Sequence, residues 1–299
     1  MPEKLLVPLD GSKLSKIVLP YVEELAVKFG YEIIFFNVRS PAEDPYHPDL
    51  REYLQEIAEQ TRNDFQIYYK NYEDRDQNAK AVIMGSGILK SNPAKEILDY
   101  ADNENIAMII MATHGRTGIS LWALGSVAEK VVRASQSPVL LVRANVERNR
   151  RPPIRNILVP LDGSRQSETV LSYVGNLASV LKAKITLFHI ITQPYHSYTN
   201  TDGIINVSYS QSELAKKKAE AIGYLEKAGE KINQYDVTTT IEVKTGQPSE
   251  EIILFAEEND FDVIAMSTHG CSGFHSAGHG SVTDKVLHSG KTPLLLARK

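Results

Sequence analysis

Cysteine is almost missing from this chain of 299 residues, which has only Cys271. A single cysteine excludes an intrachain disulfide and a Cys-x-x-Cys metal site, and it is typical of a reducing compartment. Long apolar runs are also missing, since no segment approaches the ~18 residues of a membrane span. The N-terminal residues MPEKLLVPLDGS lack the basic and apolar regions of a signal peptide. We therefore expect a soluble, cytoplasmic protein without a membrane partner.

Neither basic nor acidic residues are in large excess. The formal net charge is −4, with no basic surplus, so nothing indicates a nucleic-acid partner. The sequence GxxxxGK[ST] does not occur, which leaves no Walker lysine for the terminal phosphates of a nucleotide. No Ser-His-Asp or Cys-His pattern indicates a nucleophile. His275, His279 and His288 match no metal-ligand spacing, and we expect neither a metal site nor catalytic residues.

The chain does contain one segment in two similar copies. IIMATHGRTGISLWALGS spans residues 109–126, and IAMSTHGCSGFHSAGHGS spans residues 264–281. Each copy is an apolar run, then Thr-His-Gly, nine residues, and Gly-Ser at the start of a helical pattern. The first N–H groups of a helix attract anions, so a strand that leads through a glycine loop into a helix is an arrangement that holds phosphate. The duplication predicts two such pockets.

The repeat covers the whole sequence. LLVPLDGSKLSKIVLPYVEELA at residues 5–26 returns as ILVPLDGSRQSETVLSYVGNLA at residues 157–178. A period of this length indicates duplication of a domain rather than a solenoid. The charged, Pro-Pro-containing segment at 144–155 is typical of a linker. We expect domains at residues 1–145 and 154–299.

Within each copy, short runs of Val, Ile and Leu alternate with helical patterns. Such runs are typical of strands buried on both faces, and the alternation predicts a parallel sheet with helices on both sides. Each domain is therefore expected to be a doubly wound α/β unit of five strands in the order 3-2-1-4-5. The expected strands are 5–9, 32–38, 81–84, 107–112 and 138–142 in the first copy, and 157–161, 184–191, 239–244, 263–266 and 293–297 in the second.

Two further features concern contacts. The last strand of each copy is an exposed edge in an isolated domain, so we expect the two copies to pair with each other within the chain. We expect two such chains to associate further as a homodimer. The segments 40–80 and 192–229 are the least regular. The first turns amphipathic after an acidic start, and the second holds a Tyr-rich stretch that we interpret as a solvated loop, with a pocket mouth or interface as the alternative.

Ligands of doubly wound sheets lie beyond the carboxyl ends of the strands. Asp10 and Asp162 each follow the first strand of a copy, in Pro-Leu-Asp-Gly-Ser. If strands one and four are neighbours, this carboxylate faces the glycine loop across one crevice. Ser126 is a candidate N-cap, and it and Val127 are expected to offer N–H groups to an anion.

Both halves resemble the universal stress protein domain, and the chain is similar to a tandem member of that family. The motif of the nucleotide-binding branch is Gly, two residues, Gly, nine residues, Gly, then Ser or Thr. The copies align from Ala112 and from Ser267, each of which stands where the motif has its first glycine. If that position needs positive φ or bare backbone, the added Cβ weakens binding.

The resemblance implies that each domain binds ATP or AMP, and it leaves open Mg²⁺ held through the phosphates. It places the aspartates near the adenosine, Val38 and Ile190 on the adenine, the methionines at the sugar and base, and the glycines and serines at the phosphates. Arg116, where the second copy has Cys271, is expected either to pair with a phosphate or to lie in solvent. The candidate nucleotide-binding residues are Pro8, Leu9, Asp10, Val38, Met111, Ala112, Gly115, Arg116, Gly125, Ser126, Val127, Pro160, Leu161, Asp162, Ile190, Met266, Ser267, Gly270, Gly280, Ser281 and Val282.

Three functions remain open at this point. The first is a nucleotide-binding module that serves a stress response through binding or signalling. The second is a slow ATP hydrolase that uses phosphate-bound Mg²⁺ and a residue such as Asp10. The third is a nucleotide-free dimeric scaffold. Binding is better supported than turnover, because neither glycine loop contains Asp or Glu to position a water molecule.

Overall fold

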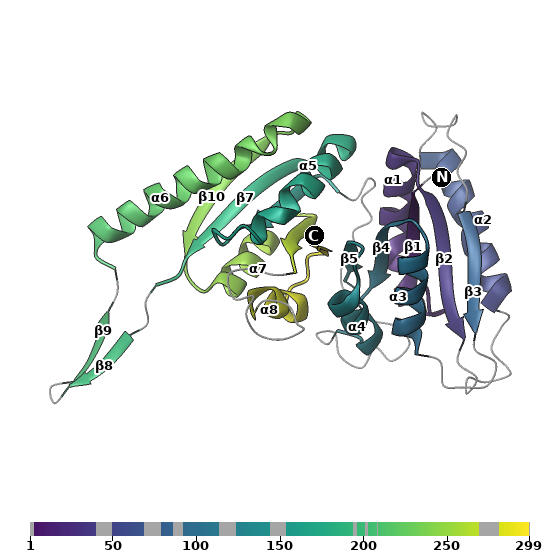
Figure 1. The fold of residues 1–299 in the computed structure, drawn as a ribbon, viewed down its shortest axis with the longest axis horizontal. Helices are drawn as coiled ribbons and strands as arrows, with labels where there is room; N and C mark the ends of the chain where they lie inside the picture. The colour runs from purple at the N-terminus through teal and green to yellow at the C-terminus, as the bar shows by residue number, and fades with distance from the viewer. Residues whose placement is uncertain are drawn as a thin grey trace.

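The computed structural model describes residues 3–39, 50–68, 79–85, 92–113, 124–143, 154–193, 196–200, 203–207, 209–268 and 281–298. These residues form two α/β halves that lie side by side (Figure 1). The ten strands expected from the sequence are present, with ends that differ from the expected ones by two residues at most.

In the first half, the strands are β1 (Lys4–Pro8), β2 (Glu32–Arg39), β3 (Ala79–Gly85), β4 (Ile106–Ala112) and β5 (Val139–Val142). Its helices are α1 (Leu19–Phe29), α2 (Leu50–Tyr68), α3 (Pro93–Asn103) and α4 (Ser126–Ala134), with a short 3₁₀ helix at Leu14–Val18.

In the second half, the matching strands are β6 (Asn156–Pro160), β7 (Lys184–Ile191), β10 (Thr239–Thr245), β11 (Val263–Ser267) and β12 (Leu294–Ala297). Its helices are α5 (Val170–Leu181), α6 (Gln211–Glu230), α7 (Pro248–Glu258) and α8 (Ser281–Ser289), with 3₁₀ helices at Ser167–Thr169 and Asn233–Tyr235. A hairpin of β8 (His196–Asn200) and β9 (Gly203–Val207) completes the set.

The ten main strands form one sheet in the order β10-β7-β6-β11-β12-β5-β4-β1-β2-β3. Each half thus has the order 3-2-1-4-5, and its strands are parallel to one another. The halves join where β12 pairs antiparallel with β5, in the register Leu295 to Leu140. The expected pairing of the two last strands is confirmed, and it removes the edge that each half would otherwise expose.

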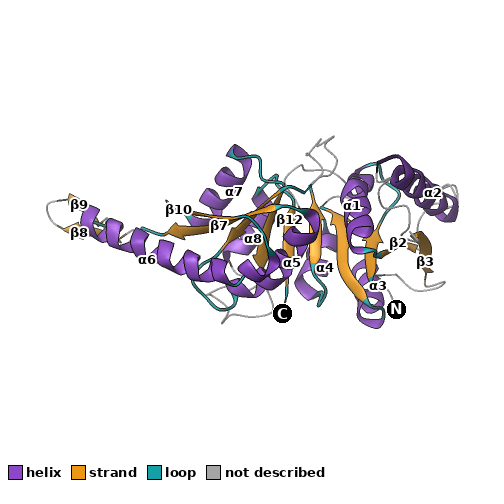
Figure 2. Cartoon of the chain, turned by 90° about the horizontal axis from the view of Figure 1, so that it is seen from above, coloured by secondary structure: helices purple, strands orange, loops and turns teal. Residues whose placement is uncertain are grey.

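Helices cover both faces of this sheet, as Figure 2 shows from above. Successive side chains of a strand point to opposite faces, so Leu5 packs under α1 and α2 while Leu6 packs under α3 and α4. In the second half, α5 and α6 cover the first of these faces, and α7 and α8 cover the second. Each apolar layer contains residues of both halves, so the two domains share their cores.

The Tyr-rich segment of the second half corrects one expectation. Residues 196–200 and 203–207 pair as the antiparallel strands β8 and β9, with Tyr198 opposite Ile205, so the interpretation as a loop is wrong there. The physical reason is visible in the sequence, where β-branched and aromatic residues flank an Asp-Gly pair. In Figure 1 this hairpin extends away from the rest of the second half.

Candidate functional site

Each half has a cavity at the carboxyl ends of its first and fourth strands. In the first half it has a volume of about 350 Å³, and in the second half about 470 Å³. The structure brings most of the candidate residues together there. The first cavity is lined by Pro8, Leu9, Asp10, Val38, Met111, Ala112, Gly125, Ser126 and Val127, and the second by Pro160, Leu161, Asp162, Ile190, Met266, Ser267 and Val282.

The two aspartates stand in identical turns. Gly11 and Gly163 both have φ of 87°, a left-handed conformation that glycine adopts without steric cost. The N–H of Ser12 donates to Asp10 Oδ1 at 2.9 Å, and the N–H of Ser164 donates to Asp162 Oδ1 at 2.9 Å. The Asp-Gly-Ser sequence therefore fixes one oxygen of each carboxylate in the turn and holds the side chain at the cavity wall.

A pair of side chains that the sequence analysis missed anchors these turns from the neighbouring strand. Asn37 Nδ2 donates to the carbonyl of Leu9 at 2.6 Å, and His189 Nδ1 lies 2.8 Å from the carbonyl of Leu161. A carbonyl accepts only, so His189 carries its proton on Nδ1. Both residues precede the candidate adenine-packing position, and their shared place in the two copies was the signal available in the sequence.

Helix α4 begins at the wall of the first cavity and requires a correction. Gly125 is its N-cap residue, Ser126 is its first helical residue, and no side chain caps it, so the expected cap by Ser126 is wrong. The first backbone bond runs from Glu129 to the carbonyl of Gly125 at 2.9 Å. The N–H groups of Ser126, Val127 and Ala128 therefore precede the first intrahelical bond, which is the arrangement that attracts an anion.

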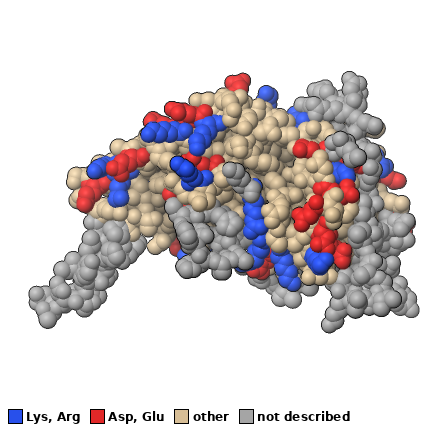
Figure 3. Space-filling view, in the orientation of Figure 1, with Lys and Arg blue, Asp and Glu red and all other residues tan. Residues whose placement is uncertain are grey.

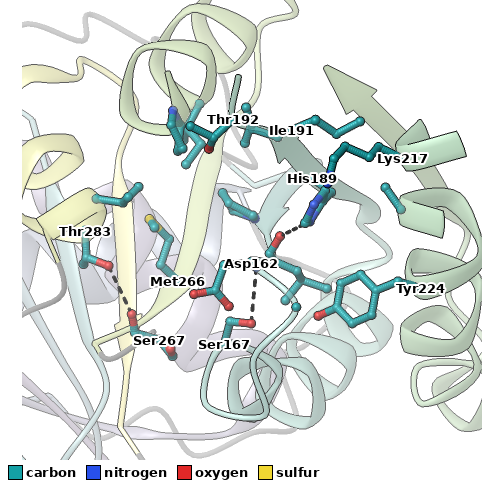
Figure 4. Close-up of a pocket in the computed structure, with 18 of the residues that line it drawn as sticks. Asp162, Ser167, His189, Ile191, Thr192, Lys217, Tyr224, Met266, Ser267 and Thr283 are labelled. Atoms are coloured by element: carbon teal, nitrogen blue, oxygen red, sulfur yellow. Dashed lines mark hydrogen bonds between the residues drawn. The ribbon is translucent and has the colours of Figure 1, made fainter. Parts of the chain in front are cut away.

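Helix α8 occupies the same position in the second half. It begins at Ser281, and Val282 and Thr283 of its first turn line the second cavity. The hydroxyl of Thr283 donates to the carbonyl of Ser267 at 3.4 Å, which links the helix start to the end of β11 (Figure 4). Ser281 itself starts this helix but is not among the lining residues of the cavity.

The positions that replace the first motif glycine are free of backbone strain. Ala112 ends β4 and Ser267 ends β11, and neither is among the described residues with positive φ. An extended backbone accepts any L-residue, so only the Cβ and the Ser267 hydroxyl occupy space that glycine would leave open. Both residues line their cavities and are about 8% exposed.

Apolar side chains form one wall of each cavity. Val38, Phe36 and Met111 lie in the first, and Ile190 and Met266 in the second. These residues belong to or pack against the apolar layer under α3, α4, α7 and α8. A wall of this kind can accept a flat, weakly polar ring, while the aspartate and the helix start provide polar groups on other sides.

The second cavity has an additional wall that the sequence did not predict. Lys217, Glu220, Ala221 and Tyr224 of α6 line it, whereas no described residue of α2 lines the first. Figure 4 shows His189 between Asp162 and this helix. Tyr224 meets the ring of His189 edge-on at 5.9 Å, and burial raises the pKa of its hydroxyl above the usual value. The wall of α6 makes the second cavity larger and more polar.

Several predicted residues lie outside the described part of the chain. These are Gly115, Arg116, Gly270, Gly280 and, with them, Cys271, His275 and His279. Among the described residues, no group of three or more His, Cys, Asp or Glu side chains could hold a metal ion. His288 is described, and its Nδ1 lies 2.8 Å from the carbonyl of Asp284 in the same helix. None of the described helices has the length and hydropathy that crossing a membrane requires.

The family model of the universal stress protein family matches the chain twice, at residues 1–143 and 153–298. The chain belongs to this family. A universal stress protein of Mycolicibacterium smegmatis is 22% identical over 298 residues, which is 98% of this chain and 96% of that protein. Universal stress protein MJ0577 of Methanocaldococcus jannaschii is 29% identical over 160 residues, 48% of this chain and 96% of its own length.

A solved structure gives the same result for the fold. The crystal structure of a universal stress protein from Archaeoglobus fulgidus matches with a TM-score of 0.64 at 19% identity, and covers 99% of this chain and 98% of its own. At this identity the likeness concerns the fold alone. It supports the arrangement of two α/β halves in one chain.

Proposed function

We propose that this universal stress protein binds an adenine nucleotide, ATP or AMP, in each of its two cavities and acts as a binding or signalling module of a stress response. One observation carries the proposal. In both halves, a carboxylate held by a glycine turn lines the same cavity as the first turn of a helix. A nucleotide can contact both groups at once. Its phosphate is an anion for the N–H groups of the helix start, and its hydroxyl or amine groups can donate to the carboxylate.

The dimensions and chemistry of the cavities support a ligand of this class. Volumes of about 350 and 470 Å³ lie in the range of small-molecule sites, ≈ 300–1,000 Å³. The apolar wall with Val38 and Met111 suits the face of a base, and it lies in the same cavity as Asp10 and Ser126. In the second half, Ile190, Met266 and Asp162 provide the same set.

In the first cavity, binding is favoured over turnover. Among the described residues that line the first cavity, Asp10 is the one carboxylate, and no lysine, arginine or histidine lines it. Efficient phosphoryl transfer uses cations on the terminal phosphates and a group that positions the nucleophile. Release of phosphate from ATP that disappears in Asp10→Ala would instead establish the slow hydrolase.

The test uses one matched pair of variants in each half. Val127 and Val282 occupy the second position of α4 and α8, where a side chain borders the cavity. Val127→Asp adds a charge that repels phosphate, and Val127→Asn introduces a side chain of the same shape as aspartate without the charge. We expect Val127→Asp to lower ATP affinity at the first site on the order of tenfold or more, and Val127→Asn to lower it much less. Val282→Asp and Val282→Asn repeat the comparison in the second half.

Equilibrium dialysis with radiolabelled ATP and AMP measures these affinities. Mass spectrometry of ligand extracted from the purified protein gives an independent result, with ATP or AMP expected. Equal affinity of the Asp and Asn variants would contradict the placement of phosphate at the helix starts. No bound nucleotide in either experiment would favour the nucleotide-free scaffold.

A further inference from the structure

The two helices that begin at the cavities also meet at the boundary between the halves. Arg133 of α4 forms an ion pair with Asp284 of α8, with Nη2 and Oδ1 3.3 Å apart. Beside them, β5 and β12 pair antiparallel and continue the sheet from one half into the other. Each helix therefore extends from its own cavity to the opposite domain.

Arg143 connects the first half to helix α8. It follows β5 directly, is about 8% exposed, and donates from Nη2 to the carbonyl of Val286 at 2.8 Å. Val286 belongs to the second turn of α8, whose start borders the second cavity. Burial lowers the pKa of Arg143 to about 10, so the guanidinium still carries its charge at neutral pH.

Arg298 makes the reciprocal contact. It follows β12 as Arg143 follows β5, and its Nη2 donates to the carbonyl of Arg133 at 2.9 Å. Arg133 lies in the last turn of α4, whose start borders the first cavity. The Nε atoms of both arginines are buried and have no hydrogen-bond partner among the described residues, so the carbonyl bonds hold the two guanidinium groups.

The contacts have a mechanical consequence for the cavities. Helices α4 and α8 have nine residues each, a length at which an isolated helix is marginal in water and depends on its contacts. A cation at the carbonyl end of a helix is favourable, because it meets the negative end of the helix dipole. A nine-residue helix is a rod of about 14 Å, so a shift of its carbonyl end also moves the N–H groups at the cavity.

We propose that Arg143 and Arg298 are positioning residues for the opposite domain. Arg143 of the first half holds α8 in place for the second site, and Arg298 of the second half holds α4 in place for the first site. The inference rests on the proposed function, because it assumes that the helix starts bind the phosphates. Each nucleotide site is then completed by an arginine from the other half of the duplication.

The crossed assignment gives a test that a purely structural role would not pass. In the Val127→Asp variant the second site is the one that keeps its native affinity for ATP, and in the Val282→Asp variant it is the first site. In the Val127→Asp background, Arg143→Met should weaken ATP binding roughly fivefold or more, and Arg298→Met should stay within about twofold. In the Val282→Asp background the two arginines should exchange roles. Methionine keeps much of the apolar stem and removes both the charge and the donor.

Lysine variants serve as controls for the methionine variants. Arg143→Lys and Arg298→Lys retain a positive charge and a donor, so they should restore part of the lost affinity, and they replace a methionine variant that does not fold. Equal losses in both backgrounds, a loss confined to the arginine's own domain, or no loss would each overturn the inference. Absence of ATP binding in both parent backgrounds would instead overturn the proposed function.

Discussion

At the scale of single residues, a buried carboxyl group lies at the boundary between the two halves. Glu24 of α1 is fully buried, and its Oε2 accepts from the N–H of Ile154 at 3.2 Å, at the start of the second half. Its Oε1 is buried and has no hydrogen-bond partner among the described residues. Burial, partly offset by the Ile154 N–H, raises the pKa of Glu24 from 4.5 to about 7.

This carboxyl predicts a pH dependence of stability. Its pKa is higher in the folded than in the unfolded chain, so the folded state holds the extra proton between about pH 4.5 and 7, and stability falls as pH rises through that window. We expect Glu24→Gln to match the native chain near pH 5 and to be more stable at pH 8, by a difference on the order of 3 kcal/mol. Urea unfolding at the two pH values measures this. The same difference at pH 5 and pH 8 would show that Glu24 is not the titrating group.

Residue roles were predictable where they repeat, and not where they depend on contacts distant in sequence. Asp10 and Asp162 could be placed from their strand ends, and the structure puts both at cavity walls. Arg143 and Arg298 are also a repeated pair, but their partners lie 143 and 165 residues away, and no local pattern indicates such a bond. No local pattern distinguishes Glu24 from other helix charges, because its hydrogen-bond partner is Ile154 at the start of the second half.

At the level of elements, the duplication provides its own comparison. The residue that caps the C-terminal end of α1 is Gly30, with φ of 72°, and the one that caps α5 is Lys182, with φ of 57°. The two residues occupy the same position of the two copies, and both adopt the left-handed conformation that favours glycine. The second copy therefore holds a non-glycine residue where the first has the residue best suited to a helix end.

The helix ends predict opposite effects for two exchanges. Lys182→Gly should raise the free energy of unfolding by about 1 kcal/mol, because it removes the Cβ strain, and Gly30→Lys should lower it by a similar amount. Thermal or urea unfolding of the two variants measures both. A destabilised Lys182→Gly would show that the lysine side chain contributes more than the backbone strain costs.

The elements that sequence patterns located well are the buried strands, because runs of Val, Ile and Leu bounded by turns have few alternative structures. The start of α4 differed by one residue, since Gly125 takes the cap position and leaves the Ser126 side chain outside it. The hairpin of β8 and β9 was missed, because its alternation is short and its polar residues are typical of a loop. The wall of α6 was missed because only the tertiary fold brings it to the cavity.

At the scale of the whole molecule, the two described halves share one ten-stranded sheet and two apolar layers rather than forming two independent domains. Leu158 of β6 is fully buried and belongs to the layer that also contains Leu6 and Leu141 of the first half. A domain that unfolded alone would expose the paired edge of β5 and one side of both layers. We therefore expect the halves to unfold together.

Leu158→Ala tests this cooperation. The loss of a fully buried leucine should cost about 2–5 kcal/mol, and hydrogen exchange should accelerate in β1 and β4 as well as in β6. Hydrogen exchange with mass spectrometry reads both halves in one experiment. Ile67→Ala is the control, because Ile67 is 59% exposed and should leave exchange unchanged. Faster exchange confined to residues 154–298 would show that the halves unfold separately.

If the duplicated cavities are two nucleotide sites, the number of ATP molecules bound per chain shows it without further assumptions. Equilibrium dialysis at the lowest ATP concentration that fills both native sites should give two per native chain, and fewer for Val127→Asp and Val282→Asp, approaching one as the altered site weakens further. The double variant should bind fewer still at this concentration, because both of its sites have lost affinity. A native chain that binds no ATP or AMP, or a double variant that still binds two, would contradict the account.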